Sequence, residues 1–419
     1  MRIVLATWGS YGDLNPYLGL ALGLRARGHE PILATMPRYR EDVEREGIAF
    51  RPLGPDVGPD AAEVVRRIMD PARGSEYLIR DVVLSQIERS YEELTEAAVG
   101  ADFLISHPVT YAAPLVAERL SLPWAAAVLA PMSFFSRYEM PVVTQAPWLG
   151  RLWGVPGAGQ AFVRLARIAT RGWDEPVVRL RRTLGLKPAG NAIYEGQFSP
   201  HLNLALFSRV LARPQPDWPL RTVITGPIFY DRTTGGPGLS PSLSRFLDAG
   251  PPPIVFTLGT AAVGVAGRFY AESVQAAREL GRRAVLLVGS SPENHPPAPL
   301  PSEIHLTHAA PFSALLSRAA ATVHSGGAGS LAQALRSGRP QLVVPHAHDQ
   351  ADNAYRATRL GVASTLPASR YRSDRAAAAL RVLLEEESVA RRAVGVGATV
   401  AAEDGIATAC HAIEGLFGA

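Results

Sequence analysis

The segment from residue 324 to 356 combines residue types and spacing that suit the binding of a diphosphate. It is HSGGAGSLAQALRSGRPQLVVPHAHDQADNAYR, in which a Gly-rich turn follows an apolar run and opens a helical pattern. Backbone N–H groups at the start of such a helix bind phosphates, and glycines let a ligand approach the backbone closely. His324 is predicted to donate a further hydrogen bond to the phosphate.

The same segment carries a second polar group after its next apolar run. Asp349 and Gln350 stand side by side, where a carboxylate and an amide can bind adjacent sugar hydroxyls. Each residue also has a purely structural interpretation: His324 ends a strand and Asp349 caps a helix. Their combination at the ends of two parallel strands favours a ligand site, because open α/β sheets bind ligands there.

A third polar loop lies near the start of the chain. Residues 8–16, WGSYGDLNP, follow the apolar run at 2–7 and place Asp13 at the carboxyl end of that run. Gly, Asp and Asn are ordinary turn residues that need no function. An acid at this edge of a sheet can nevertheless act on a bound ligand, and Asp13 can cap the following helix as well.

These three sites must be positioned by alternating strands and helices. A helical pattern from residue 14 to 28 separates the first two predicted strands, and similar patterns separate the others, which is typical of parallel sheets covered by helices. In the first half of the chain, strands are predicted at residues 2–7, 30–35, 48–53, 102–107, 124–130 and 202–207.

A second series of strands follows residues 213–242, which are rich in Pro, Gly and Ser and therefore suit a domain boundary. These strands are predicted at residues 253–259, 283–289, 303–308, 321–326, 341–346 and 362–366. A chain of 419 residues exceeds the roughly 250 to 300 that one core holds. We therefore expect two doubly wound α/β domains with a ligand cleft between them.

Composition and motifs exclude several classes of function. The formal charge of +4, from 42 basic and 38 acidic residues, is too small to indicate a nucleic-acid partner. Neither the dinucleotide Gly-x-Gly-x-x-Gly spacing nor the Walker lysine motif is present. A single cysteine, Cys410, and the lack of a long apolar run fit a cytoplasmic protein.

The segment from 324 to 356 resembles the donor signature of the family 1 glycosyltransferases. That family has two facing Rossmann-like domains in the arrangement called GT-B. The signature consists of a His, a Gly-rich turn, small residues, Pro, then Asp-Gln and Asn. It is matched here by His324, Gly326, Gly327, Gly329, Ser330, Ala334, Leu335, Gly338, Pro340, Pro345, Asp349, Gln350 and Asn353.

The loop GSYGDLNP resembles one branch of the family at every fixed position of Gly-Ser-x-Gly-Asp-x-x-Pro. Antibiotic-aglycone and sterol glycosyltransferases belong to that branch, as does the rhamnosyltransferase of rhamnolipid synthesis, to which several further segments are similar. By this resemblance Asp13 is the general base of an inverting transfer to a hydroxyl group.

The resemblance also assigns the donor and acceptor residues. No cofactor beyond the nucleotide sugar is implied, and no metal site is expected, since His346 and His348 lack a third ligand nearby. Ser10, His107, Phe134 and Phe135 are expected at the acceptor. The expected donor-binding residues are Thr260, Ala310, His324, Gly326, Gly327, Ala328, Gly329, Ser330, Asp349 and Gln350.

The resemblance implies an acceptor-binding domain over residues 1–215, joined by a C-terminal helix at 400–419, and a donor-binding domain over residues 216–399. Transfer of rhamnose from dTDP-L-rhamnose to a lipid or another hydrophobic acceptor is the favoured function. The same parts would serve a UDP-glucose transferase acting on polyketide, sterol or flavonoid acceptors. A non-catalytic GT-B binding protein and a sugar-nucleotide epimerase are weaker alternatives.

The basic and aromatic segment from 151 to 187 is a candidate for peripheral contact with an anionic membrane, on the inner membrane face. Eight Arg or Lys residues stand there against two acids. An amphipathic helix with such a composition can bind a membrane surface, although a solvated helical face explains the same pattern. The oligomeric state is left open.

Overall fold

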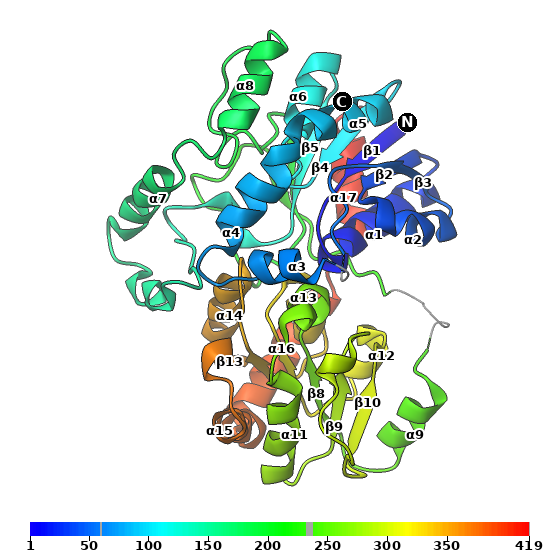
Figure 1. Ribbon diagram of the computed structural model, residues 1–419, viewed down its shortest axis with the longest axis vertical. Helices are drawn as coiled ribbons and strands as arrows, with labels where there is room; N and C mark the ends of the chain where they lie inside the picture. Colours follow the sequence, from blue (N-terminus) through cyan, green and yellow to red (C-terminus); the bar gives the residue numbers. More distant parts are fainter. Residues whose placement is uncertain (59–60, 232–237, 419) are drawn as a thin grey trace.

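The computed structural model describes residues 1–58, 61–231 and 238–418, and these form two parallel β-sheets, one above the other in Figure 1. Most residues of the inner strands are buried, because helices cover both faces of each sheet. This is the doubly wound α/β architecture that the sequence predicts.

The first sheet has the strand order β3-β2-β1-β4-β5-β6-β7 and is parallel throughout. β4 is the middle strand and β1 is its neighbour, so the loops that follow these two strands emerge near the middle of one sheet edge. The strands are β1 (Arg2–Ala6), β2 (Glu30–Thr35), β3 (Ala49–Pro52), β4 (Phe103–Ser106), β5 (Trp124–Val128), β6 (Leu202–Ala205) and β7 (Thr222–Ile224).

The second sheet has the order β10-β9-β8-β11-β12-β13 and is also parallel throughout. β8 and β11 are its central pair, so the loop after β11 is again at the middle of an edge. The strands are β8 (Ile254–Thr257), β9 (Ala284–Leu287), β10 (Ile304–Thr307), β11 (Ala321–His324), β12 (Gln341–Val343) and β13 (Ala363–Thr365).

The helices pack on the faces of these sheets, and none among the described residues is long and apolar enough to cross a membrane. They are α1 (Tyr11–Ala26), α2 (Arg40–Arg45), α3 (Ala62–Ile68), α4 (Gly74–Glu76), α5 (Ile87–Ala98), α6 (Ala113–Leu120), α7 (Ala158–Ala169), α8 (Glu175–Thr183), α9 (Pro241–Asp248), α10 (Gly259–Ala262), α11 (Phe269–Glu279), α12 (Phe312–Leu316), α13 (Ala328–Arg336), α14 (Gln350–Arg359), α15 (Ser373–Glu385), α16 (Glu387–Ala401) and α17 (Gly405–Glu414).

Each of the twelve strands predicted from the sequence is present, and β7 is an additional one. β7 has only three residues, all half-buried, and it lies inside the Pro-rich stretch that we interpreted as a boundary. The first sheet therefore continues to Ile224, past the domain boundary predicted after residue 215.

The last helix returns to the first sheet. α17 packs against α1 so closely that a Cβ on Gly23 would clash with Ile406 Cγ2, and Arg27 forms an ion pair with Glu414 at 3.0 Å. Cys410 is completely buried in this contact. The chain thus returns from the second sheet to the first between α16 and α17 (Figure 1).

Candidate active site between the two sheets

Asp13 is positioned by the way α1 begins. Ser10 is the N-cap residue, and its backbone N–H and its hydroxyl donate to Asp13 Oδ2 at 2.8 and 3.2 Å. This reciprocal arrangement is a capping box. Gly9 makes room for it, because its φ is +138° and a Cβ there would clash with the same oxygen. The remaining oxygen, Oδ1, is left facing away from the cap.

His107 follows β4 and faces that remaining oxygen. Its Nε2 lies 3.6 Å from Asp13 Oδ1, too far for a hydrogen bond. Its Nδ1 accepts from the N–H of Val109 at 3.3 Å, so we assign the ring proton to Nε2. Burial lowers the pKa of His107 to about 3, so the ring is neutral at physiological pH. Both Ser10 and His107, expected at the acceptor, therefore contact or face Asp13.

The pKa of Asp13 is raised to about 6, chiefly because surrounding protein disfavours its charge; the hydrogen bonds from Ser10 oppose the shift. The side chain nevertheless keeps 32% of its surface exposed. A carboxylate that is both accessible and of raised pKa suits a general base, since the most effective base has a pKa near the working pH.

The glycine turn after β11 has the geometry of an anion site. Gly326 has φ +89°, and a Cβ there would lie 2.7 Å from Val343 Cγ1. α13 then begins after Gly327, and Leu331 N–H donates to Gly327 O at 2.9 Å. The N–H groups of residues 328–330 precede that bond and have no acceptor within the helix. They are free to bind an anion.

His324 bonds other residues of the second domain through both ring nitrogens. It is completely buried, its Nδ1 accepts from Gly326 N–H at 3.1 Å, and its Nε2 pairs with Gln341 Oε1 at 3.0 Å. With both nitrogens engaged inside the fold, the ring has no N–H to offer a phosphate in this structure. In this structure the ring supports the glycine turn, and its bond to a phosphate stays a prediction.

Asp349 and Gln350 lie at the start of α14, beside that turn. Asn353 Nδ2 donates to Asp349 Oδ2 at 2.8 Å and to Gly326 O at 2.9 Å, so it joins the two donor segments. Gln350 Oε1 closes its own loop by accepting from the N–H groups of His346 and Ala347 at 2.8 and 3.3 Å. This leaves the amide nitrogen of Gln350 for a sugar.

Asp13 and Asp349 stand at the beginnings of α1 and α14, which follow strands of different sheets. The pKa of Asp349 is raised to about 7, first by burial and next by the charge of Asp13. The elements that carry them also meet, since α1 contacts both α10 and α13. Sequence positions more than 300 residues apart therefore form one site.

Thr260 and Ala310, two further residues predicted to bind the nucleotide sugar, follow strands of the second sheet. Thr260 is exposed on α10, and Ser325 Oγ, which donates to Leu258 O at 2.7 Å, joins this helix to the glycine turn. Ala310 is half-buried after β10, where it packs with Phe312 against the apolar core around Val255. Neither placement shows a role, so both remain predictions.

Phe134 and Phe135 pack against other aromatic side chains of the first half of the chain. Phe134 is 5% exposed and stacks on Trp218 with 4.4 Å between ring centroids, while Phe135 packs on Tyr194 at 4.8 Å. Both line a cavity of about 890 Å³ beside α7, together with several arginines. Asp13 does not line this cavity. A role for these two aromatic side chains at the acceptor therefore stays a prediction.

Two tryptophans follow in the same part of the chain. Trp148 is exposed, and Trp153 packs against Tyr355 of α14 with 5.1 Å between ring centroids. The sequence reasoning missed the ion cluster beside this contact, formed by Glu139, Asp352 and Arg356. The spacing of Asp352 and Arg356, four residues apart in a helix, was the available signal.

The histidine pair at 346 and 348 is engaged in its loop. His346 Nδ1 bonds Val344 O at 2.8 Å, and His348 Nδ1 bonds Ser75 Oγ at 3.2 Å. Across the part of the chain that the structure describes, no group of three or more His, Cys, Asp or Glu residues is placed to hold a metal ion.

Two family models match the chain, one on each sheet. Residues 3–133 match the glycosyltransferase family 28 N-terminal domain, and residues 284–413 match the C-terminal domain of the erythromycin biosynthesis protein CIII-like family. The two matches cover the segments that carry Asp13 and the donor turn, respectively.

Curated relatives match along nearly the whole length. O-mycaminosyltylonolide 6-deoxyallosyltransferase from Streptomyces fradiae is 34% identical, covering 99% of this chain and 97% of the relative. Vancomycin aglycone glucosyltransferase from Amycolatopsis orientalis is 30% identical, covering 98% and 96%. The crystal structure of glycosyltransferase VinC in complex with dTDP superposes with a TM-score of 0.68 at 23% identity, covering all of both chains.

Proposed function

We propose, because the chain belongs to the family 1 glycosyltransferases with the GT-B fold, that it transfers a 6-deoxyhexose from a dTDP-linked donor to a hydroxyl group of a hydrophobic natural product. L-rhamnose is the sugar that the sequence favours. The transfer inverts the anomeric carbon, and Asp13 is its general base.

One observation carries this proposal: α1, which begins beside Asp13, packs against α13, which begins at the glycine turn. A sugar bound by Asp349 and Gln350 is thereby presented to Asp13. The free N–H groups of residues 328–330 lie on the same side as these residues, since Asn353 links the glycine turn to Asp349.

The chemistry follows from this arrangement. The acceptor hydroxyl loses its proton to Asp13 Oδ1 while its oxygen forms a bond to the anomeric carbon. The bond from that carbon to the diphosphate oxygen breaks on the opposite face, and dTDP leaves with the electron pair. The helix N–H groups stabilise the charge that develops on the diphosphate.

The donor is inferred from the relatives. The Streptomyces fradiae relative is by name a 6-deoxyallosyltransferase, and VinC was solved with dTDP. Transfer of glucose from UDP-glucose is the second candidate, because the relative from Amycolatopsis orientalis is a glucosyltransferase. Asp349 and Gln350 suit either sugar, so the donor must be measured.

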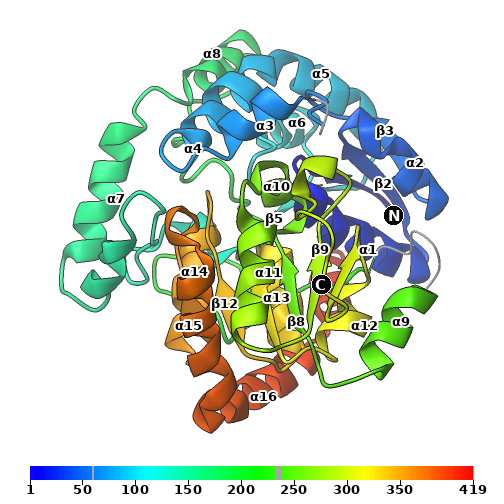
Figure 2. The ribbon, with the colours of Figure 1, turned by 60° about the horizontal axis from the view of Figure 1, so that its bottom comes forward.

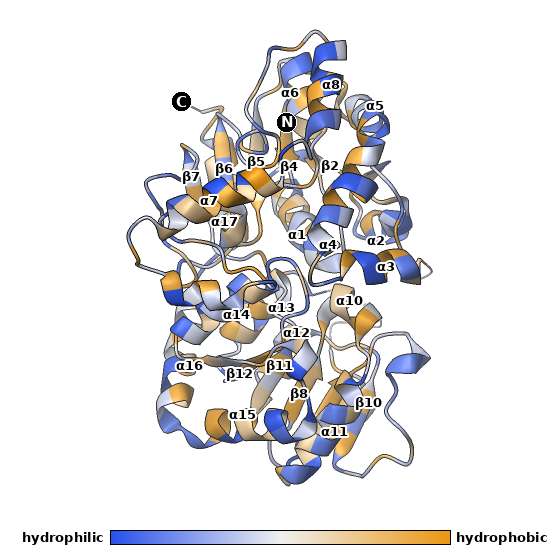
Figure 3. Cartoon of the chain, turned by 60° about the vertical axis from the view of Figure 1, so that its left-hand side comes forward, coloured by the Kyte–Doolittle hydropathy of each residue, from blue (hydrophilic) through white to orange (hydrophobic). Residues whose placement is uncertain are grey.

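We also propose that α7 gives the enzyme a peripheral contact with anionic membrane. Leu165 and Ile168 are 65% and 62% exposed on this helix, beside Arg164 and Arg171. Hydrophobic and hydrophilic residues mix along α7 in Figure 3, and the helix stands at the edge of the molecule in Figure 2.

A donor panel tests the proposed transfer. Purified protein is assayed for nucleotide release with dTDP-L-rhamnose, dTDP-6-deoxyallose and UDP-glucose, with a macrolide aglycone as acceptor. We expect release from the dTDP donors, with the product's anomeric configuration inverted. Preference for UDP-glucose would overturn the donor assignment, and retention of configuration would overturn the single-step mechanism.

The matched variant is Asp13→Asn, which keeps an oxygen for Ser10 but cannot take a proton. We expect turnover to fall by roughly 100-fold or more, the scale of a general base, while dTDP binding measured by calorimetry stays the same. Wild-type turnover in this variant would remove the base assignment.

A further inference from the structure

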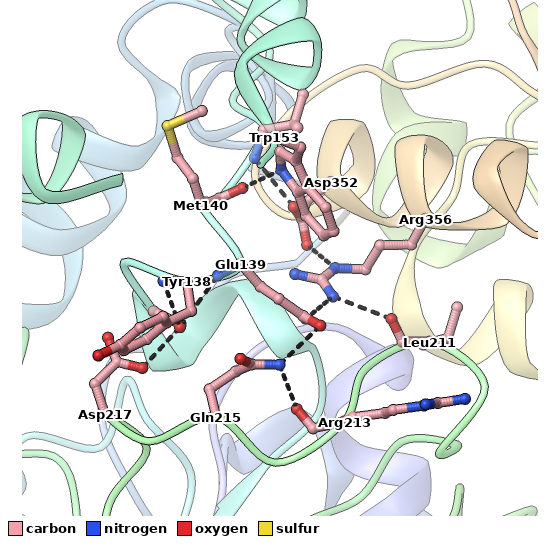
Figure 4. Close-up of polar contacts among 12 residues, drawn as sticks. Tyr138, Glu139, Met140, Trp153, Leu211, Arg213, Gln215, Asp217, Asp352 and Arg356 are labelled. Atoms are coloured by element: carbon pink, nitrogen blue, oxygen red, sulfur yellow. Dashed lines mark hydrogen bonds and ion pairs between the residues drawn. The ribbon is translucent and has the colours of Figure 1, made fainter. Parts of the chain in front are cut away.

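A buried ion cluster joins α14 to the first domain. Arg356 has 2% of its side chain exposed and donates through Nε to Asp352 Oδ2 at 2.6 Å, one turn earlier on the same helix. Its Nη1 donates to Glu139 Oε2 at 2.7 Å and to Leu211 O at 3.0 Å, both from the first half of the chain. Figure 4 shows these contacts.

The other carboxylate oxygens of the cluster are satisfied as well. Val142 N–H donates to Asp352 Oδ1 at 3.0 Å, and Gln215 Nε2 donates to Glu139 Oε1 at 2.9 Å (Figure 4). Fully bonded buried ions are weak evidence for stability, because desolvation offsets most of their attraction. Such a cluster can instead specify one arrangement of the groups that it joins.

Aromatic contacts extend the same interface along α14. Trp153 lies under both Arg356 and Arg359, with 4.9 and 4.6 Å from guanidinium carbon to ring centroid. Tyr355 donates to Gly150 O at 2.5 Å, and a Cβ on Gly150 would clash with the Tyr355 ring. The segment 139–153 therefore holds one long face of α14.

The loop before α14 also forms a hydrogen bond with the first domain. His348 bonds Ser75, and its φ of +56° is unusual for a residue other than glycine. α14 follows β12 of the second sheet, yet its N-terminal loop and its body both contact the first domain. Its position thus depends on both domains at once.

We infer that Arg356 is a positioning residue: by fixing α14 against the segment 139–153, it places Asp349 and Gln350 opposite Asp13. Arg356 lies seven residues after Asp349, about two helical turns or roughly 10 Å along the axis. A tilt of α14 at Arg356 therefore displaces the sugar-binding pair. The inference rests on the proposed function, because it concerns the sugar that Asp349 binds.

The test uses Arg356→Lys and Glu139→Gln in the full-length protein. Lys keeps the positive charge but cannot donate to Asp352 and Glu139 as a planar fork, and Gln removes one charge from a side chain that is 20% exposed. We expect kcat to fall roughly 10- to 100-fold, the effect of a misplacement of about 1 Å. The affinity for dTDP, which lacks the sugar, should stay the same.

A double-mutant cycle separates positioning from general stability. If Arg356 acts through Asp349, Arg356→Lys combined with Asp349→Asn should be about as slow as Asp349→Asn alone. Multiplicative losses, or an equal loss of dTDP affinity, would overturn the inference. Glu387→Gln, which removes an exposed ion pair with Arg391, is the control and should leave kcat unchanged.

Folding and function are checked independently. Thermal unfolding shows whether each variant is folded; if Arg356→Lys is not, Glu139→Gln carries the same cycle. A wild-type protein that binds dTDP but transfers no sugar would overturn the proposed function. In that case the inference is still tested by binding alone. The wild type should bind the dTDP-sugar more tightly than dTDP, and Glu139→Gln should lose this difference in affinity.

Discussion

Asp13 performs two tasks with one carboxyl group. One oxygen caps α1 through Ser10, and the other faces His107. Because the cap uses only Oδ2, the structural interpretation of this residue and the functional one are compatible. Burial lowers the pKa of His107 to about 3, so its neutral ring adds no charge beside the carboxylate.

The pH dependence of transfer provides a test at the level of single residues. The base must be ionised, so kcat/KM should fall as the pH drops below about 6, the pKa of Asp13. In His107→Ala, water replaces part of the ring and burial of the carboxylate decreases. Its pKa should then move back toward 3.8, and the acidic limb of the pH profile should move to lower pH.

The control for that profile is His411→Ala, which removes an imidazole from the surface of α17. It should leave the acidic limb in place. An acidic limb that stays near pH 6 in His107→Ala, or moves upward, would show that His107 does not raise the pKa of Asp13.

Among the helices and strands, the site is made from the beginnings of three helices. α1 presents Asp13, α13 presents its unpaired N–H groups, and α14 presents Asp349 and Gln350. Each helix follows a central strand or its neighbour, so the three beginnings gather at facing sheet edges. Glycines are required where the chain turns from strand to helix, as Gly9 and Gly326 show.

Gly326→Ala tests the donor turn. The positive φ costs a residue with a Cβ about 1–2 kcal/mol, and the new Cβ would also press on Val343. We expect the turn to shift and the affinity for dTDP to fall at least roughly tenfold, which is about 1.4 kcal/mol. Calorimetric titration with dTDP measures this loss.

Gly395→Ala serves as the matched glycine control. Gly395 lies in α16, where a Cβ would meet no described atom within 4 Å. This variant should bind dTDP like the wild type. Equal affinity in Gly326→Ala would mean that the glycine turn does not determine binding of the diphosphate.

Across the molecule, contacts between the domains are unequally distributed. α17 packs against α1 on one side, and the segment 139–153 contacts α14 on another. α7, by contrast, stands at the edge of the molecule and buries only Gly159 among its residues. A helix this weakly packed is available for an external surface.

Vesicle sedimentation tests whether that surface is a membrane. The protein should sediment with phosphatidylglycerol vesicles at low salt and be released at high salt, where charges are screened within a few ångströms. Ile168→Glu should abolish sedimentation, because it places an acid among the arginines of α7. Val394→Glu, at an equally exposed site on α16, should not. Equal sedimentation with neutral vesicles would contradict an electrostatic contact.

Much of the fold and part of the site could be predicted because they depend on neighbours in sequence. Apolar runs of strand length, separated by helical patterns, predict both sheets, and the family assignment from residues 324–356 is confirmed by the relatives. The three-residue strand β7 lacked such a signal. Phe134 both stacks on Trp218 and lines a cavity, and nothing in the sequence separates a core aromatic side chain from one in a pocket.

Local sequence was sufficient to locate the beginnings of α1 and α13 and the residues that their turns require, because caps and positive φ angles are local properties. It was not sufficient to show that Gln341 forms a hydrogen bond with Nε2 of His324. Nor did it show that Arg356 donates to Glu139, 217 residues away in the sequence. Those partners are chosen by packing between strands and between domains, which exists only in the folded chain. The same packing brings α1, which carries Asp13, against α10 and α13 of the second domain.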